Sequence, residues 1–507
     1  MEKIRIIGRN SRLSLLQLEI VQRKIEAAYP GMEVEVIARS SRGDTNRDVP
    51  LHTLEGSDFF TEEIFESLST GEADIAVHSL KDMSSAHFFG SNTFAVVDRD
   101  DARDIAIFRS NAKEKIKNGD KLIIGTCSPR REEMAIGFLQ KALPQDNNFI
   151  ITTKSIRGNV DTRLRKLDEG EYDGIILATA GLNRLLRSDA DAATIRSLLH
   201  DKLLMLLPLI ECVPAPCQGA IVAEAIPSNE IAIMVLNAIN EAKLEKDCID
   251  EKKTASRYGA GCIQRFGVTS LNYGANRSVY AAGTNEVGES FSHWSGLPSL
   301  DFGNKNLFTS TEYMGKFFDY EFQDDHSSIE ESIVYVANYK AIRRAGLLDQ
   351  LRSKKVWAAG TKTWFELAKK GIWVEGCADA FGLESLVQPW SMPLFNINRE
   401  NVALITNTQS VHGWATKGWK VYGTYDFIEK QSPEIVGMIR NADVLFWTSF
   451  RQYEQYKDQI KENAIHACPY GETAELLRAA GIEPVVFPNI KAFQQWRQIS
   501  SRSRSVA

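Results

Sequence analysis

The run Ala73-Asp-Ile-Ala-Val-His-Ser-Leu-Lys-Asp82 carries the signal that decides the fold. Residues 73–77 form an almost continuous apolar stretch, which is typical of a strand buried inside a parallel sheet. The polar block 78–82 follows directly, at the carboxyl end of that strand. Because ligands bind at that edge in open α/β sheets, this run predicts both a fold class and the position of a site.

Short apolar runs and amphipathic helices alternate over the first part of the chain. This alternation predicts α/β layers with mostly parallel sheets. Two further polar blocks follow predicted strands, Gly125-Thr-Cys-Ser-Pro-Arg-Arg131 and Arg157-Gly-Asn-Val-Asp-Thr-Arg163. The periodicity predicts strands over residues 4–7, 34–38, 122–124, 149–152 and 172–177, and helices over residues 14–28 and 60–68.

The arginines of these blocks indicate the kind of ligand. Arginine keeps its proton and grips carboxylates with a two-pronged fork, so several arginines around one site indicate a ligand with many carboxylates. Hydroxyls and free N–H groups at helix starts add further anion-binding groups. A phosphate ligand is less favoured, because the chain has no Gly-x-x-x-x-Gly-Lys or Gly-x-Gly-x-x-Gly motif. The arginines are Arg9, Arg130, Arg131, Arg157, Arg163 and Arg184.

Two single residues have both a structural and a functional interpretation. Cys262, in Tyr258-Gly-Ala-Gly-Cys262, is either an inert buried thiol or an attachment point for a ligand. Asp82 is either an ion-pair partner of Lys81 or a carboxylate that stabilises a developing cation and moves a proton. The position of Asp82 at a strand end favours the functional interpretation.

Length and composition set the broad class. The 507 residues predict three to four compact units, and 43% hydrophobic with 25% charged residues describe an ordinary soluble protein. A net charge of −6 with no basic stripe argues against nucleic-acid and anionic-membrane partners. The chain starts directly as a predicted strand and has no apolar stretch of about 20 residues, so we expect no signal peptide and no membrane span. Because the seven cysteines are scattered, we expect no disulfide framework and no metal site. A monomer in the cytoplasm is expected.

The order and spacing of the blocks resemble one family, hydroxymethylbilane synthase, also called porphobilinogen deaminase. The resemblance covers about the first 300 residues. Its segments are Arg9-Asn-Ser11 with Gln17, Ala76-Val-His-Ser-Leu-Lys-Asp-Met83, the blocks 125–131 and 156–164, Lys166-Leu-Asp-Glu-Gly-Glu-Tyr-Asp173, Leu177-Ala-Thr-Ala-Gly-Leu-Asn-Arg184, Gln218-Gly219 and Gly261-Cys262.

The resemblance implies a three-domain α/β fold. Two lobes like type II periplasmic binding proteins (residues 1–220) enclose a catalytic cleft, and a small α+β domain (residues 221–304) carries the cofactor cysteine. It also implies a dipyrromethane cofactor bound to Cys262 through a thioether. Four porphobilinogen units are then condensed onto this primer with release of ammonia, and hydrolysis frees a linear tetrapyrrole.

The resemblance further assigns roles to residues of this chain. Asp82 is the catalytic residue, which stabilises cationic intermediates and assists proton transfer. Substrate-binding residues are Arg9, Ser11, Gln17 and Arg163. Besides Cys262, cofactor-binding residues are Ser79, Lys81, Thr126, Ser128, Arg130, Arg131, Arg157, Arg184, Gln218 and Gly219.

The sequence departs from the family pattern at several positions. The family's basic loop reads here Gly56-Ser-Asp-Phe-Phe60-Thr-Glu-Glu63, without its two lysines. Pro129, Cys217, Lys252 and Arg265 stand where leucine, glycine, arginine and proline are usual. Because the core set survives, we expect activity, with loop-dependent steps slowed or differently controlled.

Residues 305–507 contain an internal repeat at an offset of 110 residues. The repeat predicts two similar α/β lobes, each running strand, helix, strand and then a threonine-started helix that ends at a glycine. The pairs are Val334 with Val444, Thr363 with Thr473, Leu367 with Leu477, Gly371 with Gly481, and Ile372 with Ile482.

The two C-terminal lobes resemble uroporphyrinogen-III synthase, through their Gly-x-x-Thr-like helix starts and Phe446-Trp-Thr-Ser449. The resemblance implies closure of the linear tetrapyrrole with inversion of its last ring. It places a tyrosine near the substrate, either Tyr425 or Tyr422, and Tyr425 is the substrate-binding candidate. The leading hypothesis is therefore a fused, bifunctional enzyme. The alternatives are a synthase with a non-catalytic C-terminal docking module, and a non-catalytic anion-binding protein.

Overall fold

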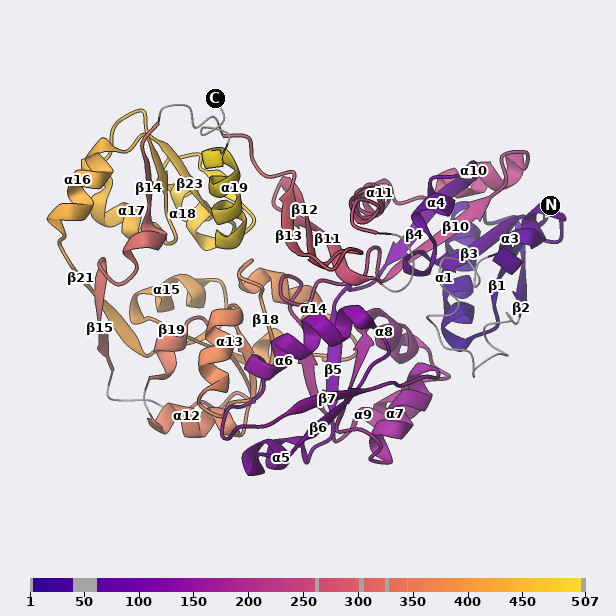
Figure 1. The fold of residues 1–507 in the computed structure, drawn as a ribbon, viewed down its shortest axis with the longest axis horizontal. Coiled ribbons are helices and arrows are strands. Elements are labelled where there is room, and N and C mark those ends of the chain that lie inside the picture. Colours follow the sequence, from indigo (N-terminus) through magenta and orange to yellow (C-terminus); the bar gives the residue numbers. More distant parts are fainter. Residues whose placement is uncertain are drawn as a thin grey trace.

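The computed structural model describes residues 3–39, 62–259, 264–300, 305–323, 328–343 and 345–502, shown in Figure 1. The strands of these residues form six sheets. Four lobes of α/β structure follow one another, two in the N-terminal half and two in the C-terminal half, and a small three-stranded sheet lies between them (Figure 1).

The first lobe contains a five-stranded sheet in the order β2-β1-β3-β10-β4. Strands β1 to β3 are parallel, whereas β10 runs antiparallel between β3 and β4. Apolar side chains of β1, β3 and α1 meet in its core, among them Ile6, Val77 and Leu18. The elements are β1 (Lys3–Arg9), α1 (Arg12–Ala28), β2 (Glu33–Arg39), α3 (Glu62–Ser69), β3 (Ile75–Ser79), β4 (Thr93–Arg99), β10 (Ala220–Ala225) and α10 (Glu230–Ile239).

The second lobe repeats this plan with the order β7-β6-β8-β5-β9. Here β5 is the antiparallel strand next to β8. The predicted strands and helices of both lobes are confirmed to within a few residues. The elements are β5 (Asp104–Phe108), α5 (Ala112–Asn118), β6 (Leu122–Gly125), α6 (Ile136–Ala142), β7 (Ile151–Lys154), α7 (Val160–Asp168), β8 (Gly174–Ala178), α8 (Thr179–Arg187), α9 (Ala192–Leu199) and β9 (Leu203–Leu206).

The chain crosses between these lobes twice, through residues 100–103 and residues 207–219. Residues 221–239, which the sequence placed with the small domain, lie in the sheet and helix layer of the first lobe. Helix α11 (Ala242–Ala255) then leads to an antiparallel meander of three strands. These strands are β11 (Arg265–Tyr273), β12 (Asn276–Thr284) and β13 (Ser290–Ser295).

The 110-residue repeat is confirmed as two parallel sheets with matching elements. One sheet has the order β18-β17-β16-β19-β20 and the other the order β14-β22-β23-β24. Gly371 and Gly481, which end the equivalent helices α13 and α18, both have positive φ values, 71° and 82°. The matching elements are β16 (Ile333–Val336) with β22 (Val444–Phe446), α12 (Ala345–Arg352) with α17 (Phe450–Tyr456), β17 (Lys355–Ala358) with β23 (Ile465–Pro469), α13 (Thr361–Ala368) with α18 (Glu472–Ala479), and β18 (Val374–Cys377) with β24 (Val485–Phe487).

The chain enters the last lobe, leaves it and returns. Strand β14 (Leu307–Thr309) pairs with β22 just as β19 (Val402–Thr406) pairs with β16. An antiparallel ladder of β15 (Phe318–Phe322) and β21 (Tyr425–Glu429) joins the two C-terminal lobes (Figure 1). The remaining elements are β20 (Lys420–Gly423), α14 (Val387–Ser391), α15 (Thr408–Thr416), α16 (Pro433–Asn441) and α19 (Ile490–Arg502).

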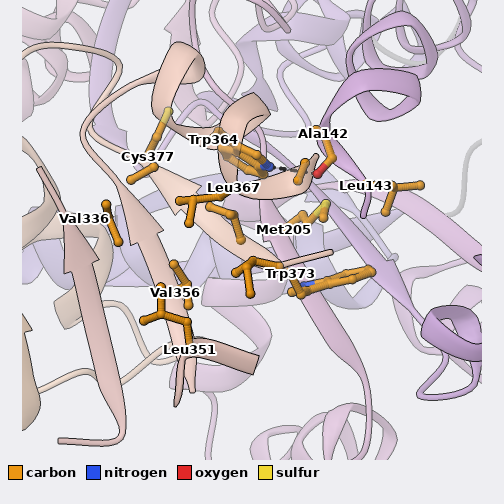
Figure 2. Close-up of a cluster of buried hydrophobic side chains, with 14 of the residues drawn as sticks. Ala142, Leu143, Met205, Val336, Leu351, Val356, Trp364, Leu367, Trp373 and Cys377 are labelled. Atoms are coloured by element: carbon orange, nitrogen blue, oxygen red, sulfur yellow. Dashed lines mark hydrogen bonds between the residues drawn. The ribbon is translucent and has the colours of Figure 1, made fainter. Parts of the chain in front are cut away.

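The two halves share one hydrophobic core, which we call the seam. It joins side chains of the second lobe, such as Phe138 and Met205, to side chains of the third, such as Trp364. Figure 2 shows the Trp364 ring in this core, and its Nε1–H donates to the Ala142 carbonyl at 3.0 Å. Trp373 donates likewise to the Leu204 carbonyl at 3.1 Å. The seam is therefore built like a domain interior, and its two indole N–H groups are paired across it.

Candidate active site

The first polar block lies at the carboxyl end of β3, as the sequence predicts. Lys81 and Asp82 are both exposed there, in a single 3₁₀ turn. Gln17, on α1, donates from Nε2 to the Ser79 hydroxyl at 3.0 Å. Helix α1 thus holds the strand end in place, and the Asp82 carboxylate is open to a ligand.

Buried charge supports this block from below. Glu224 on β10 is fully buried, and its two carboxylate oxygens lie 2.8 Å from His78 Nε2 and 2.9 Å from His87 Nε2. Burial acts to raise the pKa of Glu224, but the two histidines outweigh it and lower the pKa to about 2. The carboxylate therefore stays ionised beneath the turn that carries Asp82.

The second and third polar blocks meet at the carboxyl edge of the second sheet. Thr126 is buried, and its hydroxyl accepts from the Ser128 amide at 3.2 Å. Arg163 donates from Nε to the Gly158 carbonyl at 2.8 Å. The pKa of Arg163 is lowered, first by burial and further by the charge of Arg131. Arg131 and Arg163 thus both add positive charge at this sheet edge, which favours binding of an anion.

Asp104, the first residue of β5, organises the arginine pair of the second block. Its fully buried carboxylate accepts from Arg130 at 2.7 Å, from Arg131 at 2.8 Å and from Gln218 at 2.9 Å. Burial acts to raise the pKa of Asp104, but the two arginines outweigh it and hold that pKa well below its usual range. Sequence reasoning missed this residue.

Arg130 uses both its terminal nitrogens within the protein, and so does Arg131, which donates to Asp104 and to the Ile176 carbonyl at 3.3 Å. Arg130 Nη1 donates to the Val213 carbonyl at 2.7 Å, and its Nη2 to Asp104. Arg130 is only 4% exposed. These contacts make Arg130 a link between the second lobe and the crossover 207–219, and its role as a cofactor ligand stays a prediction.

Arg184 makes a second link between the lobes. Its guanidinium, on α8, donates to the Gly219 carbonyl at 2.5 Å, at the end of the crossover. Gly219 has φ = 85°, and a Cβ atom there would lie 2.4 Å from the Asp100 carbonyl oxygen. Only glycine fits this position, where the two crossovers touch. Gln218 also joins them, by donating to the Ala102 carbonyl at 2.6 Å.

A cavity of about 290 Å³ lies between the first two lobes. Ser11 lines it from the first lobe and Asn159 from the second, and Ser11 also caps α1 by accepting from the Ser14 amide at 3.4 Å. Arg9 ends β1 on the same side, and Arg157 precedes α7. The lobes therefore bring Ser11 and the third polar block to one interface.

Cys262 and residues 56–61 of the loop 56–63 lie outside the described residues, and α3 begins at Glu62. The chain is described up to Gly259, after α11, and again from Gln264, before β11. Tyr258, beside this segment, stacks on Phe291 of the small sheet with ring centroids 3.8 Å apart. The attachment role of Cys262 stays a prediction.

Comparison with known proteins decides the family. A family model described as the dipyrromethane cofactor binding domain of porphobilinogen deaminase matches residues 4–233. The porphobilinogen deaminase of Campylobacter concisus is 36% identical over 287 residues, which are 55% of this chain and 84% of that protein. The chain belongs to the porphobilinogen deaminase family.

Two other porphobilinogen deaminases match to a similar extent. The protein of Sulfurimonas denitrificans is 34% identical over 57% of this chain and 83% of its own length. That of Streptococcus sanguinis is 33% identical over 57% of this chain and 89% of its own length. The family relationship accounts for little more than the first half of the chain.

The described residues fit the cofactor of the porphobilinogen deaminase family. A dipyrromethane with acetate and propionate side chains needs cations and hydroxyl donors, and Arg131, Arg163, Thr126 and Ser128 supply these at one sheet edge. Among the described residues, no cluster of His, Cys, Asp and Glu could hold a metal ion. No helix of the described part is long and apolar enough for a membrane span.

The C-terminal half places polar residues where its two lobes face each other. Arg451, at the start of α17, donates to the Asn407 side chain at 3.4 Å, and Asn407 follows β19 of the other lobe. Tyr425 is buried nearby, and burial, with Tyr320 next, raises its pKa well above the usual range. Tyr422 instead donates its hydroxyl to Glu331 at 2.9 Å. Tyr425 is thus the tyrosine nearer to this group of residues.

Proposed function

We propose that the protein is a hydroxymethylbilane synthase. It condenses four porphobilinogen units onto a dipyrromethane attached to Cys262 and releases one ammonia at each condensation. The observation that carries the proposal is the placement of Asp82 after β3 of the first lobe and of Arg131 and Arg163 after β6 and β7 of the second, all beyond the carboxyl ends of their strands. The membership of the porphobilinogen deaminase family supports it.

The charges of the site divide into binding and chemical roles. Arg131 and Arg163 bind the carboxylates of primer and growing chain, since each charge-assisted hydrogen bond contributes about 1.5–3 kcal/mol. Asp104 fixes the direction of Arg131 through its 2.8 Å hydrogen bond. The bound dipyrromethane supplies the nucleophilic pyrrole carbon. Asp82 stabilises the cation that forms on the incoming unit when ammonia leaves, and it accepts the proton that the attacking pyrrole carbon of the chain loses as the new bond forms.

The mass of the intact protein tests the cofactor. The active protein should carry the added mass of a dipyrromethane, and this mass should be absent from Cys262→Ser. Cys127→Ser is the matched control, because Cys127 is the described cysteine that is partly exposed. An unmodified mass in active protein would contradict the proposal.

The role of Asp82 is tested separately from primer attachment. Asp82→Asn keeps the shape of the side chain and removes its charge, so turnover of porphobilinogen should fall by at least 100-fold while the primer mass remains. The control is Asp120→Asn, an exposed carboxylate in a loop of the second lobe. Full turnover in Asp82→Asn would refute its catalytic role.

We further infer that the C-terminal half closes hydroxymethylbilane to uroporphyrinogen III. The supporting observation is the meeting of Arg451, Asn407 and Tyr425 between two repeated lobes, at the carboxyl ends of β22 and β19 and the start of β21. Open α/β sheets bind ligands at this edge. Shape and hydrogen bonding control the inversion of the last ring, because a free linear tetrapyrrole closes without it.

Product analysis tests this second activity. The protein is incubated with porphobilinogen alone, the products are oxidised, and the uroporphyrin isomers are separated. Mainly type III is expected from the intact protein and from Tyr422→Phe, with a shift towards type I in Tyr425→Phe and Arg451→Ala. Type I alone from the intact protein would refute closure by the C-terminal half and leave the synthase proposal standing.

A further inference from the structure

A second cavity, of about 410 Å³, opens beside the seam at its solvent edge. Its walls come from both halves: α5, α9 and β9 of the second lobe on one side, and the end of α12 with β17 and β18 of the third lobe on the other. Trp373, which is labelled in Figure 2, lines it. This volume falls within the range of small-molecule pockets.

The cavity lies at the opposite sheet edge from the arginine-rich site. Leu203, in its wall, pairs with Phe108, and Phe108 pairs with Gly174, the first residue of β8. Lys355 is likewise the first residue of β17. Both sheets therefore present their amino edges here, whereas the polar blocks of the two proposed activities follow the carboxyl ends. The cavity belongs to neither of those sites.

The lining is strongly cationic in a protein whose net charge is −6. Six lysines and arginines line it against a single carboxylate, that of Glu375. Burial raises the pKa of this carboxylate to about 7, so its negative charge is partly lost at neutral pH. The cations are Lys113, Arg196, Lys202, Arg352, Lys354 and Lys355.

Half of these cations already have partners. Lys202 contacts Asp168 at 2.8 Å, Lys354 donates to two backbone carbonyls at 2.8 and 2.7 Å, and Arg352 donates to the Lys370 carbonyl at 3.1 Å. For Lys113, Arg196 and Lys355, the described residues provide no ion pair, and Lys113 lies over the Trp373 ring at 5.8 Å from its centroid. Burial lowers the pKa of Lys113, because removal from water disfavours its charged form, while Glu375 acts in the opposite direction.

We propose that this cavity binds a compact multivalent anion that bridges the two halves of the protein. Lys113 and Arg196 contact it from the second lobe, and Lys355 from the third. The charge of the anion offsets the mutual repulsion of these side chains, so binding stabilises the seam. Two sources share this chemistry, a polycarboxylate and a phosphorylated compound, and the cavity is too small for a linear tetrapyrrole.

Calorimetric titration of the full chain with citrate and, separately, with inorganic pyrophosphate tests the site. At least one of the two should bind and raise the melting temperature. The affinity should fall at least tenfold in Lys113→Gln/Lys355→Gln. The matched control is Lys117→Gln/Lys121→Gln, two exposed lysines of the same lobe that lie outside the cavity lining and carry the same change of charge.

A second variant separates this cavity from the arginine-rich site. Arg163→Gln should keep the binding that Lys113→Gln/Lys355→Gln loses, and the single variant Arg196→Gln should show the same loss to a smaller degree if the double variant fails to fold. Binding of citrate alone identifies a carboxylate ligand, and binding of pyrophosphate alone identifies a phosphorylated one. Binding of neither at millimolar concentration, or loss of binding in Arg163→Gln instead, would overturn the proposal.

Discussion

Buried carboxylates behave in opposite ways in the N-terminal half and on the C-terminal side of the seam. Asp104 and Glu224 are buried, yet cationic partners hold their pKa values below the usual range. Beyond the seam Glu375 is half-buried and Asp379 is buried, and the loss of contact with water raises their pKa values to about 7 and about 6. Glu331 is the exception among the buried acids described in the C-terminal half. Burial acts to raise its pKa, but its hydrogen bonds, first among them the one from Lys420, outweigh this effect and lower the pKa.

This difference shows where each half uses electrostatics. In the N-terminal half, buried anions orient arginines and histidines beneath the strand ends, so the cations face a ligand at a fixed angle. Across the seam, tryptophans and aliphatic side chains supply the stability; among the described residues Glu375 and Asp379 form no ion pair, and Asp379 accepts from the Leu209 amide at 3.2 Å. A buried carboxylate thus orients the side chains of a site in the N-terminal half, whereas in the C-terminal half its desolvation lowers the stability of the fold.

The largest effect is expected from removing Asp104. Asp104→Ala leaves Arg130 and Arg131 buried without their shared partner, so the free energy of unfolding should fall by about 3–5 kcal/mol. Urea denaturation measures this change. Asp120→Ala, at an exposed position of the same lobe, should change the stability by less than about 0.5 kcal/mol. A small loss in Asp104→Ala would mean that the network does not hold the lobes together.

The pH dependence of stability in a Glu224 variant tests the N-terminal half, where the buried carboxylates have charged or hydrogen-bonding partners. The pKa of Glu224 is lower in the folded than in the unfolded protein, so its stabilisation is present above about pH 4.5 and is lost as the pH falls towards 2. Glu224→Gln should therefore lower the free energy of unfolding by about 2–3 kcal/mol at pH 7 and by much less at pH 3. Equal losses at both pH values would contradict this, and Glu462→Gln, at an exposed position, serves as the control.

A Glu375 variant tests the C-terminal side of the seam. Its effect on the free energy of unfolding should be the smallest of the three, and it should be stabilising. The pKa of Glu375 is higher in the folded protein, so its contribution is most favourable below about pH 4.5 and is lost as the pH rises through about 7. Glu375→Gln should stabilise the protein at pH 8.5 by about 1 kcal/mol, a value discounted because the cavity admits solvent. At pH 5 the variant should match the wild type. Destabilisation at pH 8.5 would show that Glu375 is paired after all; Glu384→Gln is the control.

Much of the fold could be predicted from the sequence because its signals are local. The apolar run before His78 and the alternation of strands and helices predicted the strands of the first two sheets. The internal repeat at an offset of 110 residues predicted the two similar C-terminal lobes. Strand order is different, because β5 and β10 are antiparallel insertions whose partners lie far away in the sequence. No periodicity within a strand reports which neighbour it pairs with, so the assignment of residues 221–239 needed the structure.

The candidate site was predictable in the same partial way. Motifs located Asp82, Arg131 and Arg163, because each follows a recognisable strand. Asp104 was missed, because a single aspartate before the apolar run 105–108 looks like an ordinary strand start. Its partners Arg130 and Gln218 lie 26 and 114 residues away. The one available signal was the acid itself. It begins a strand whose other residues are all apolar, so the strand offers no polar partner for a buried carboxylate.

The seam also determines whether the protein can be divided. The burial of Trp364, Trp373 and Phe138 in one core means that each half, expressed alone, would expose an apolar face that water now never reaches. Such faces promote aggregation, so the two halves depend on each other for solubility whatever each one catalyses. Separating the two halves into independent proteins would therefore require the tryptophans of the seam to be replaced by polar residues.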